Sequence, residues 1–567
     1  MVASLRRYRP LLLACLGGFA FALTSPPTDL YPAVILGLAL LAAALVEPEA
    51  PRERGASLET PAPPRRLPGF RTAFARGAAW GTAAGILGLR FVPSVIQRFT
   101  PLGAAAAYLA LVLLAAAQSL VWALGSGLAA VLHRRARIPF EIAFAIGVFL
   151  AVSLPTIFAW TPAGLISPWP VFVQLADLVG ERGVSALFAL SAALLCRAAL
   201  AFTGRTPSVI PPEPSPPRLT RAEVLRPLLA AVALFTALAA HGALRMRAIA
   251  RASESLPSVR VGLVDQAVDP LLRWDPRYHA GILHTLRELT ASLEQRGVDL
   301  TIWPEAAYPY PLEHDNRRVP RGPRGILDGN IRGPIIVGLI TRDRPVTLPD
   351  GAIETNSYNS AALALPDGTL TAPADKLQLL WFGEMVPGGA QLPWLRRIFQ
   401  KSGGLLPGSA PRALELSRAE GPALRMAVLN CYEDTLAGVG RRVETALQPN
   451  LLVNITNDAW FFGTAEPELH ARLAAMRAIE LRRDLVRAVN MGVTSWVDGA
   501  GTVRLRGSSA APSTLVATPL VRDHGSTLYA ELGDAPLWAI SALLVVVFAW
   551  RGRPAPSRPD DLPRASS

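Results

Sequence analysis

In the stretch Met426-Ala427-Val428-Leu429-Asn430-Cys431-Tyr432-Glu433, an apolar run ends in a cysteine that is followed by polar residues. A short apolar run of this kind is typical of a buried strand. A thiol at the end of such a strand lies at the edge of a sheet, where loops gather and catalytic residues are common. A buried core cysteine is the alternative, so a catalytic Cys431 needs support from other stretches.

The composition excludes a single soluble domain. The chain has 567 residues, 51% of them apolar, and a mean hydropathy of +0.31, which is too long and too apolar for one such domain. Three cysteines cannot form a disulfide framework. Cys15 and Cys196 fall within apolar segments, so Cys431 is the only thiol outside the segments expected in a membrane.

The charge pattern favours a membrane protein over a nucleic-acid-binding protein. The formal net charge is +13, but residues 245–534 carry 32 basic and 31 acidic side chains. The remaining 24 basic and 12 acidic residues lie between and around the apolar segments, which is the positive-inside pattern. We therefore expect a membrane as a partner and no nucleic acid.

Apolar segments predict about eight transmembrane helices, of which the third to seventh approach or exceed the ~20 residues that cross a bilayer. The first two follow each other closely and are interpreted as a retained helical hairpin, although Leu12-Leu13-Ala14-Cys15 resembles a lipoprotein cleavage site. The segments are about Leu11–Leu23, Tyr31–Val46, Gly77–Ile96, Ala104–Leu132, Ile138–Phe158, Val171–Leu200, Leu225–Leu244 and Pro536–Trp550.

Alternating these segments from a cytoplasmic N-terminus puts the strongly basic short loops in the cytoplasm. The predicted domains are then about seven helices in residues 1–244, an outward-facing domain in 245–533, a last helix in 534–552 and a disordered cytoplasmic tail in 553–567. The outward region alternates strand-like and helical stretches, which predicts a layered α/β domain. Its strand-like runs are Val259–Val264, Leu300–Trp303, Pro334–Ile340, Ala361–Leu365, Met426–Leu429 and Leu451–Ile455, and its helical stretches are Tyr278–Glu294 and Pro467–Asp484.

Two further stretches supply a carboxylate and an amine. Trp303-Pro304-Glu305 delivers a carboxylate directly from a strand end, although such a Glu is commonly a solvated turn residue. Lys376 is one of only two lysines in a chain with 54 arginines, and it lies beside apolar and aromatic residues. Because Arg does not replace a compact ammonium, the lysine suggests a specific role.

Glu305, Lys376 and Cys431 together make a working set for acyl transfer. The thiol supplies the nucleophile, which a carboxylate can deprotonate and a neighbouring cation can bias toward thiolate. Lys376 and the backbone N–H of Tyr432 could hold the oxyanion of a tetrahedral intermediate, where loss of one donor typically costs ~10² to 10³ in rate.

Four motifs in this order resemble the nitrilase (carbon-nitrogen hydrolase) superfamily. With seven membrane segments before the domain and one after it, the chain is similar to the apolipoprotein N-acyltransferase family of bacterial inner membranes. The likeness is specific over about Val259–Trp538 and is mainly a matter of segment count before that. The motifs are Trp303-Pro304-Glu305, Lys376 followed by Phe382-Gly383-Glu384-Met385-Val386-Pro387, Cys431-Tyr432-Glu433, and Asn457-Asp458-Ala459-Trp460-Phe461.

The resemblance implies an αββα sandwich that faces the periplasm, with Glu305 as general base, Lys376 as oxyanion stabiliser and Cys431 as nucleophile. Separately, the seven histidines are scattered with no metal-ligand spacing near a second Cys, and no Gly-rich phosphate loop is present, so we expect no metal and no cofactor. Further residues match family positions at or near the active site, namely Glu384, Tyr432, Glu433, Trp274 and Trp460.

The resemblance also implies a reaction. Family members take the sn-1 acyl chain of a phospholipid, typically phosphatidylethanolamine, onto the cysteine as a thioester. They then pass it to the α-amine of the N-terminal S-diacylglyceryl-cysteine of an apolipoprotein. Because exposing an acyl chain to water costs about 0.8 kcal/mol per CH₂, we expect the thiol at the bilayer surface. Apolar loops at Leu379–Phe382 and Trp460–Phe462 are expected to cover the thioester, with hydrophobic core as their alternative role.

Some stretches depart from the family pattern or leave alternatives open. Three segments match the family pattern poorly, namely the turn Val264–Asp269, the Phe461-Phe462 pair and the Ile166–Pro170 loop. Donor choice and lipid entry are therefore the features that the resemblance determines least. His470 is interpreted as a surface or core histidine, and residues 388–411 as a loop that could act as a lid. Two other functions fit the motifs, a membrane-tethered amidase or nitrilase and a catalytically idle scaffold. We expect a monomer.

Overall fold

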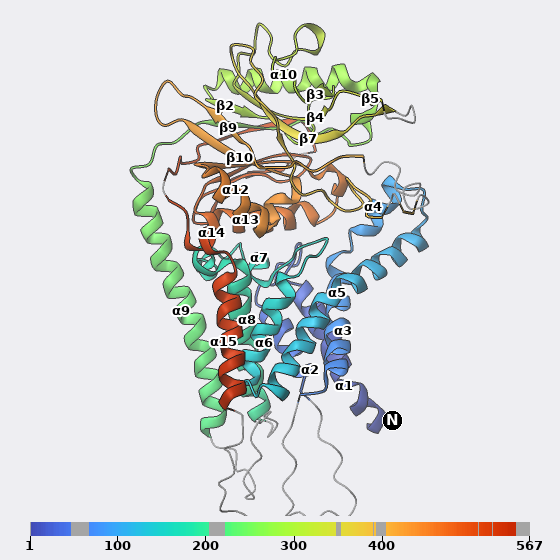
Figure 1. Cartoon of the computed structure of the whole chain (residues 1–567), viewed down its shortest axis with the longest axis vertical. Coiled ribbons are helices and arrows are strands. Elements are labelled where there is room, and N and C mark those ends of the chain that lie inside the picture. The colour runs from blue at the N-terminus through green and yellow to red at the C-terminus, as the bar shows by residue number, and fades with distance from the viewer. Residues whose placement is uncertain are drawn as a thin grey trace, which may run out of the picture.

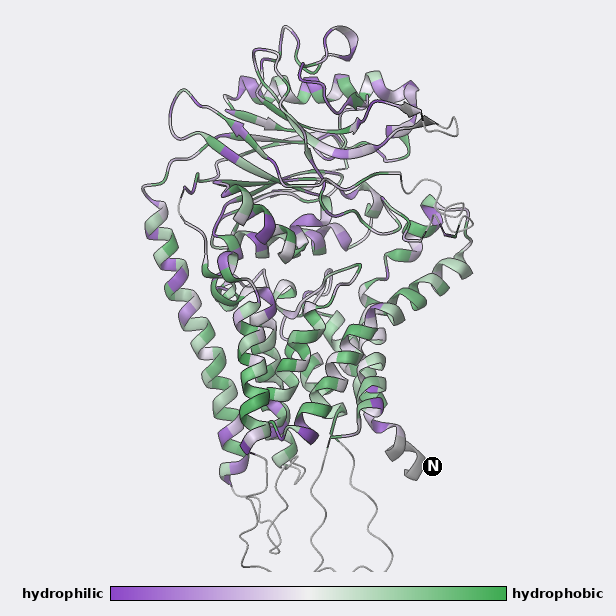
Figure 2. Ribbon diagram, in the orientation of Figure 1, coloured by the Kyte–Doolittle hydropathy of each residue, from purple (hydrophilic) through white to green (hydrophobic). Residues whose placement is uncertain are grey.

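The computed structural model describes residues 2–46, 67–202, 221–347, 353–388, 391–392, 404–508, 510–523 and 525–551 (Figure 1). The predicted cytoplasmic tail at 553–567 lies outside the described residues, as does most of the 388–411 loop. The described chain forms a layer of helices beneath an α/β part, and Figure 2 shows that apolar residues dominate the helical layer.

The helical layer contains helices at every predicted apolar segment. The turn of 3-10 helix η1 (Pro170–Phe172) precedes α8. The helices are α1 (Val2–Ala22), α2 (Ala33–Ala44), α3 (Phe70–Gly88), α4 (Val92–Phe99), α5 (Ala104–Arg135), α6 (Phe140–Ser153), α7 (Pro162–Leu165), α8 (Ala176–Phe202), α9 (Arg221–Ser253) and α15 (Ala535–Arg551).

The helix lengths support fewer complete membrane spans than the sequence predicts. Among the described residues, α5, α8 and α9 are long and apolar enough to cross a bilayer, and α3 with α4 makes a fourth if this pair, bent by 59°, is one span. The other apolar helices, including α2, are shorter. At 1.5 Å per residue, the 12 residues of α2 cover only about 18 Å of a ~30 Å hydrocarbon core. The count of eight therefore stays a prediction.

The α/β part is built on two mixed sheets. In the first, the strand order is β15-β1-β2-β4-β7-β8, and β3 pairs with β4; in the second, the order is β14-β13-β12-β11-β10-β9. The first sheet contains β1 (Val261–Asp265), β2 (Leu300–Ile302), β3 (Leu312–Glu313), β4 (Ile335–Arg342), β7 (Ser357–Ala364), β8 (Ala374–Asp375) and β15 (Ser513–Ala517). The second contains β9 (Ala413–Leu416), β10 (Leu424–Asn430), β11 (Leu451–Asn457), β12 (Leu485–Asn490), β13 (Thr494–Val497) and β14 (Val503–Gly507). A separate small pair is β5 (Val346–Thr347) with β6 (Ile353–Glu354).

Three hydrophobic cores show that the α/β part is the expected αββα sandwich. One core lies between the sheets and includes Leu263 and Val453. A second packs α10 (His279–Gln295) on the outer face of the first sheet. A third packs α12 (Ala437–Leu447) and α13 (Glu466–Leu481) on the outer face of the second. Figure 1 shows the same order of layers, with α13 between the second sheet and the helical layer.

Buried ion pairs join α13 and the segment after it to α8. The Arg477 guanidinium lies 3.0 Å from the Glu181 carboxylate and 2.8 Å from that of Glu480, and Arg477 and Glu480 have no exposed side-chain area. Just after α13, Arg482 lies 2.9 Å from Asp177. Glu181 and Asp177 lie 296 and 305 residues before their arginine partners, so these two pairs fix the sandwich on top of the helices.

Candidate active site

Cys431 begins a tight turn directly after β10. It is the first residue of η5 (Cys431–Thr435), is partly buried, and has a φ of 56°, a left-handed conformation that is uncommon for a residue with a side chain. A reciprocal capping box holds the turn, in which the Asn430 backbone N–H donates to Glu433 Oε2 at 2.7 Å. The Asn454 amide donates to the Cys431 carbonyl at 2.9 Å. The sequence thus places the thiol at a strand end, as predicted.

Lys376 is buried between two carboxylates. It directly follows β8, and its Nζ lies 3.2 Å from Glu305 Oε1 and 2.8 Å from the Glu384 carboxylate. Its side chain is only 1% exposed. The Asn359 amide on β7 donates to Glu305 Oε1 at 2.7 Å and to Glu384 Oε1 at 2.9 Å. The amine is therefore held in one position by groups from three separate segments.

Glu305 is oriented from both sides. It follows β2 through Trp303 and Pro304 and is 6% exposed. While Oε1 accepts from Lys376 and Asn359, Oε2 accepts from the Asn457 backbone N–H at 3.0 Å, just where β11 ends. One carboxylate thereby joins the two sheets at the edge where β10 also ends.

Burial and the neighbouring charges shift the pKa values of the Cys431 thiol and the Lys376 amine. Burial raises the pKa of the Cys431 thiol well above its ordinary value, Glu305 raises it further, and Lys376 opposes both. Burial alone would lower the pKa of Lys376, but Glu305 and Glu384 outweigh it and raise that pKa well above its ordinary value. At rest the site therefore holds a neutral thiol and a charged amine.

Glu433 and Tyr432 hold the loop that carries Lys376. Glu433 Oε1 accepts from the backbone N–H groups of Leu377 at 2.6 Å and Gln378 at 2.8 Å. Burial raises the pKa of Glu433 to about 7, against the opposing effects of Lys376 and three backbone N–H groups. The Tyr432 hydroxyl donates to the Leu379 carbonyl at 2.9 Å, and its ring centroid lies 5.6 Å from the Lys376 amine.

The contacts of the two tryptophans expected near the pocket are with residues outside the Glu305, Lys376 and Cys431 cluster. Trp274 is 59% exposed, and the Arg273 guanidinium lies 5.0 Å from its ring centroid. Trp460 packs on Phe99 of α4, with ring centroids 4.2 Å apart. Trp460 still lies three residues after Asn457, so it anchors the segment that orients Glu305 to the helical layer.

Asn359 and Asn454 are site residues that the sequence analysis missed. Asn359 lies within the buried part of β7 and Asn454 within β11, and both are at most 4% exposed. A buried polar residue needs a hydrogen-bond partner, so asparagines inside apolar strand runs were the available signal. Their partners lie on other segments, which the sequence alone does not reveal.

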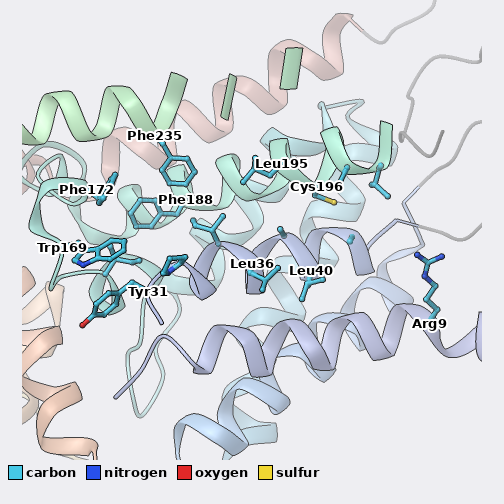
Figure 3. A pocket seen from close by; sticks show the side chains of 17 residues that line it. Arg9, Tyr31, Leu36, Leu40, Trp169, Phe172, Phe188, Leu195, Cys196 and Phe235 are labelled. Carbon is cyan, nitrogen blue, oxygen red and sulfur yellow. The ribbon is translucent and has the colours of Figure 1, made fainter. Parts of the chain in front are cut away.

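A cavity of about 470 Å³ lies between the α/β part and the helical layer; among the described residues, neighbours of the site such as Tyr432 line it, but Glu305, Lys376 and Cys431 do not. Leu380, Trp381 and Tyr432 line its upper part, while Trp122 on α5 and Trp160 line its lower part. A separate cavity of about 740 Å³ is lined by residues of the helical layer, among them Leu36, Trp169, Phe188 and Phe235 (Figure 3). Because no described residue of the α/β part lines this second cavity, it is not where Cys431 could react.

Known proteins resemble both halves of the chain. The family model described as apolipoprotein N-acyltransferase N-terminal domain matches residues 17–194, and the one described as carbon-nitrogen hydrolase matches residues 276–522. The apolipoprotein N-acyltransferase of Geobacter metallireducens is 31% identical over 70% of this chain and 70% of its own length. That of Shewanella oneidensis is 30% identical over 70% of each chain, and that of Brucella melitensis is 28% identical over 96% of this chain and 94% of its own.

The site geometry and these comparisons agree on a single class of enzyme. The two relatives with at least 30% identity span more than two thirds of both chains, and the second matched domain contains Glu305, Lys376 and Cys431. The chain therefore belongs to the apolipoprotein N-acyltransferase family, acyltransferases within the carbon-nitrogen hydrolase superfamily.

Proposed function

We propose that this enzyme transfers an acyl chain from a membrane phospholipid, through a thioester on Cys431, to the N-terminal amine of a diacylglyceryl apolipoprotein. The observation that carries the proposal is the contact between Lys376 and Glu305 beside the strained Cys431 turn. A cavity lined by Tyr432 and Thr435 of that turn and by residues of the apolar helices supports a donor that is itself a lipid. Phosphatidylethanolamine is the proposed donor.

In the acylation step, Glu305 takes the thiol proton and the Cys431 sulfur attacks the ester carbonyl of the lipid. Lys376 stabilises the oxyanion that forms, with the Tyr432 backbone N–H as the second donor. The intermediate collapses to the thioester, and Glu305 returns the proton to the departing lysophospholipid hydroxyl.

In the transfer step, the neutral α-amine of the apolipoprotein attacks the thioester carbonyl. Glu305 removes a proton from the attacking nitrogen, and the Cys431 thiol is regenerated when the C–S bond breaks. Hydrolysis of the thioester has to be slower than aminolysis. Leu380 and Trp381 would favour aminolysis by keeping water from the thioester.

The membrane setting follows from the same proposal. We propose about eight membrane segments in the bacterial inner membrane, with the α/β part in the periplasm, and a monomeric enzyme. Glu384, Tyr432 and Glu433 would act by holding Lys376 and its loop, since their polar atoms contact that amine or the loop backbone.

Labelled phospholipid tests the proposal. The full-length protein should acquire a hydroxylamine-labile acyl label, and adding a diacylglyceryl-cysteine peptide should move the label to the peptide amine. Cys431→Ala should acquire none, whereas the matched control Cys15→Ala should be labelled normally. Label retained in Cys431→Ala would contradict the proposed nucleophile, and turnover of soluble amides without any label would favour an amidase.

A further inference from the structure

His470 is a buried histidine held between two carboxylates. It lies on α13, is 4% exposed, and was expected only to be a surface or core residue. Its Nδ1 lies 3.0 Å from Asp458 Oδ1, and its Nε2 lies 2.9 Å from Asp434 Oδ1. Both aspartates are completely buried. Neither ring nitrogen is free, so the residue cannot act as the general base of the reaction.

The two partners determine the protonation state of the ring. A carboxylate oxygen at each ring nitrogen favours a ring that donates from both nitrogens, which is the positively charged imidazolium. The direction of the pKa agrees, because burial lowers the pKa of His470 but Asp434 and Asp458 outweigh it and raise it to about 10. At neutral pH, His470 is therefore an imidazolium.

The two carboxylates belong to the two turns that position the reacting groups. Asp434 lies three residues after Cys431 in the same turn, η5. Asp458 begins η6 (Asp458–Phe461) and directly follows Asn457, whose backbone N–H orients Glu305. The imidazolium thus links the turn that carries the thiol to the segment that orients the carboxylate.

The surrounding charges balance only when His470 is charged. The Arg487 guanidinium on β12 pairs with Asp434 at 3.1 Å. Burial, and next the charge of Asp458, raise the pKa of Glu466 at the start of α13 to about 8, so that Glu466 is mostly neutral at pH 7. Two cations then face two carboxylates. Since Asp458 raises the pKa of the Cys431 thiol, loss of the imidazolium would leave a negative charge uncompensated near the sulfur.

The spacing of Asp458, Glu466 and His470 would also allow a metal ion, because one ligand atom from each lies within 4.8 Å of the others. However, both His470 nitrogens already face carboxylates, and Arg487 supplies a second positive charge. A further cation would meet a cluster whose charge is already balanced.

We propose that His470 is a positioning residue, an imidazolium that clamps the Cys431 turn to the Glu305-orienting segment and cancels the charge of Asp458 near the thiol. This role rests on the proposed function of Cys431. It adds a residue that touches neither substrate nor sulfur and acts through Asp434 and Asp458.

Alkylation of Cys431 by iodoacetamide, followed across pH by peptide mass in the full-length protein, tests the role without any lipid donor. In His470→Gln, the uncompensated carboxylate should move the profile to higher pH and slow alkylation at pH 8 about tenfold, because a tenfold smaller thiolate fraction reacts tenfold more slowly. Adding Asp458→Asn to His470→Gln removes that charge and should restore the rate to within about threefold. His284→Gln, whose ring is 71% exposed on α10, is the matched control and should leave the profile unchanged.

A folded His470→Gln protein with the wild-type alkylation profile would overturn the proposal, as would failure of Asp458→Asn to restore the rate. If His470→Gln does not fold, Asp458→Asn alone decides. In that variant His470 is still charged, so the alkylation profile of Cys431 should move to lower pH. A profile that is unchanged or moved to higher pH would overturn the proposed role of His470. Because no acyl donor is used, failure of lipid labelling would count against the proposed function and not against His470.

Discussion

Individual residues of the site are held by several partners each, and Lys376 is the clearest case. Its amine contacts both Glu305 and Glu384, and Asn359 donates to the same two carboxylates. This arrangement explains why the chain keeps a lysine here. A planar guanidinium is larger and has a fixed fork of donors, so it would not fit the same space between two carboxylates.

Glu384→Gln should slow acylation of Cys431 by about 10² without unfolding the protein. The change removes one of two charges that hold the Lys376 amine, so the oxyanion donor is less well placed. The pKa of Lys376 should also fall toward its ordinary value. Single-turnover acylation measures the effect, with Glu415→Gln, at an exposed position of β9, as the matched control. Equal rates in the two variants would contradict the role of Glu384.

The sequence predicts the candidate catalytic side chains but not the residues that contact them. Glu305, Lys376 and Cys431 were predicted as one site, and the structure brings Lys376 and Glu305 into contact. The surroundings of Trp274 depend on Arg273, which is held by the Tyr308 carbonyl at 2.9 Å. Such a contact joins residues 35 positions apart, and no local pattern predicts it.

Among the elements, the Cys431 turn and the Lys376 loop behave as one unit because Glu433 bonds to both. Its two oxygens accept from Asn430 on one side and from Leu377 and Gln378 on the other. A buried carboxyl with three backbone donors fixes the distance between nucleophile and amine.

Stability should depend on pH through Glu433. Burial raises its pKa in the folded protein to about 7, from the ordinary value of 4.5. Between these values the folded state binds more protons than the unfolded state, so this contribution to stability is complete below about pH 4.5 and is lost as pH rises through 7. From about pH 4.5 to pH 7, the thermal inactivation midpoint of the wild-type protein should therefore fall more than that of Glu433→Gln. Parallel pH curves for the two proteins would contradict this assignment.

The sequence predicts strands well where the residues are apolar and poorly where they are charged. The six strand-like runs all lie on strands, but β12 was missed although it is central in its sheet. Its Arg487 is completely buried and pairs with Asp434. A buried arginine breaks the apolar pattern on which strand prediction rests. One helix start was similarly missed, since the predicted first segment begins at Leu11 whereas α1 begins at Val2.

At the scale of the whole molecule, charged residues fasten the sandwich to the helices. Arg477 on α13 lies between Glu480 of its own helix and Glu181 of α8, with no exposed area. Removing one member of a buried ion pair costs far more folding free energy than breaking an exposed pair. The charge that is left behind has neither water nor a partner.

Arg477→Met should destabilise the protein by about 3–5 kcal/mol. Arg506→Met, in which a 56% exposed arginine loses Glu468, is the matched control and should cost about 0–1 kcal/mol. Thermal inactivation and limited proteolysis compare the two. If Arg477→Met were no less stable than Arg506→Met, the buried pairs would not be what fastens the sandwich to α8.

The central claim is that Cys431, beside Glu305 and Lys376, accepts an acyl chain from a lipid. The most direct measurement is the intact mass of the purified full-length protein before and after exposure to phosphatidylethanolamine, with peptide mapping of the adduct. The wild-type protein should gain one acyl group on Cys431, and Cys431→Ser should gain none. No gain in the wild type, or an acyl group mapped to another residue, would contradict it.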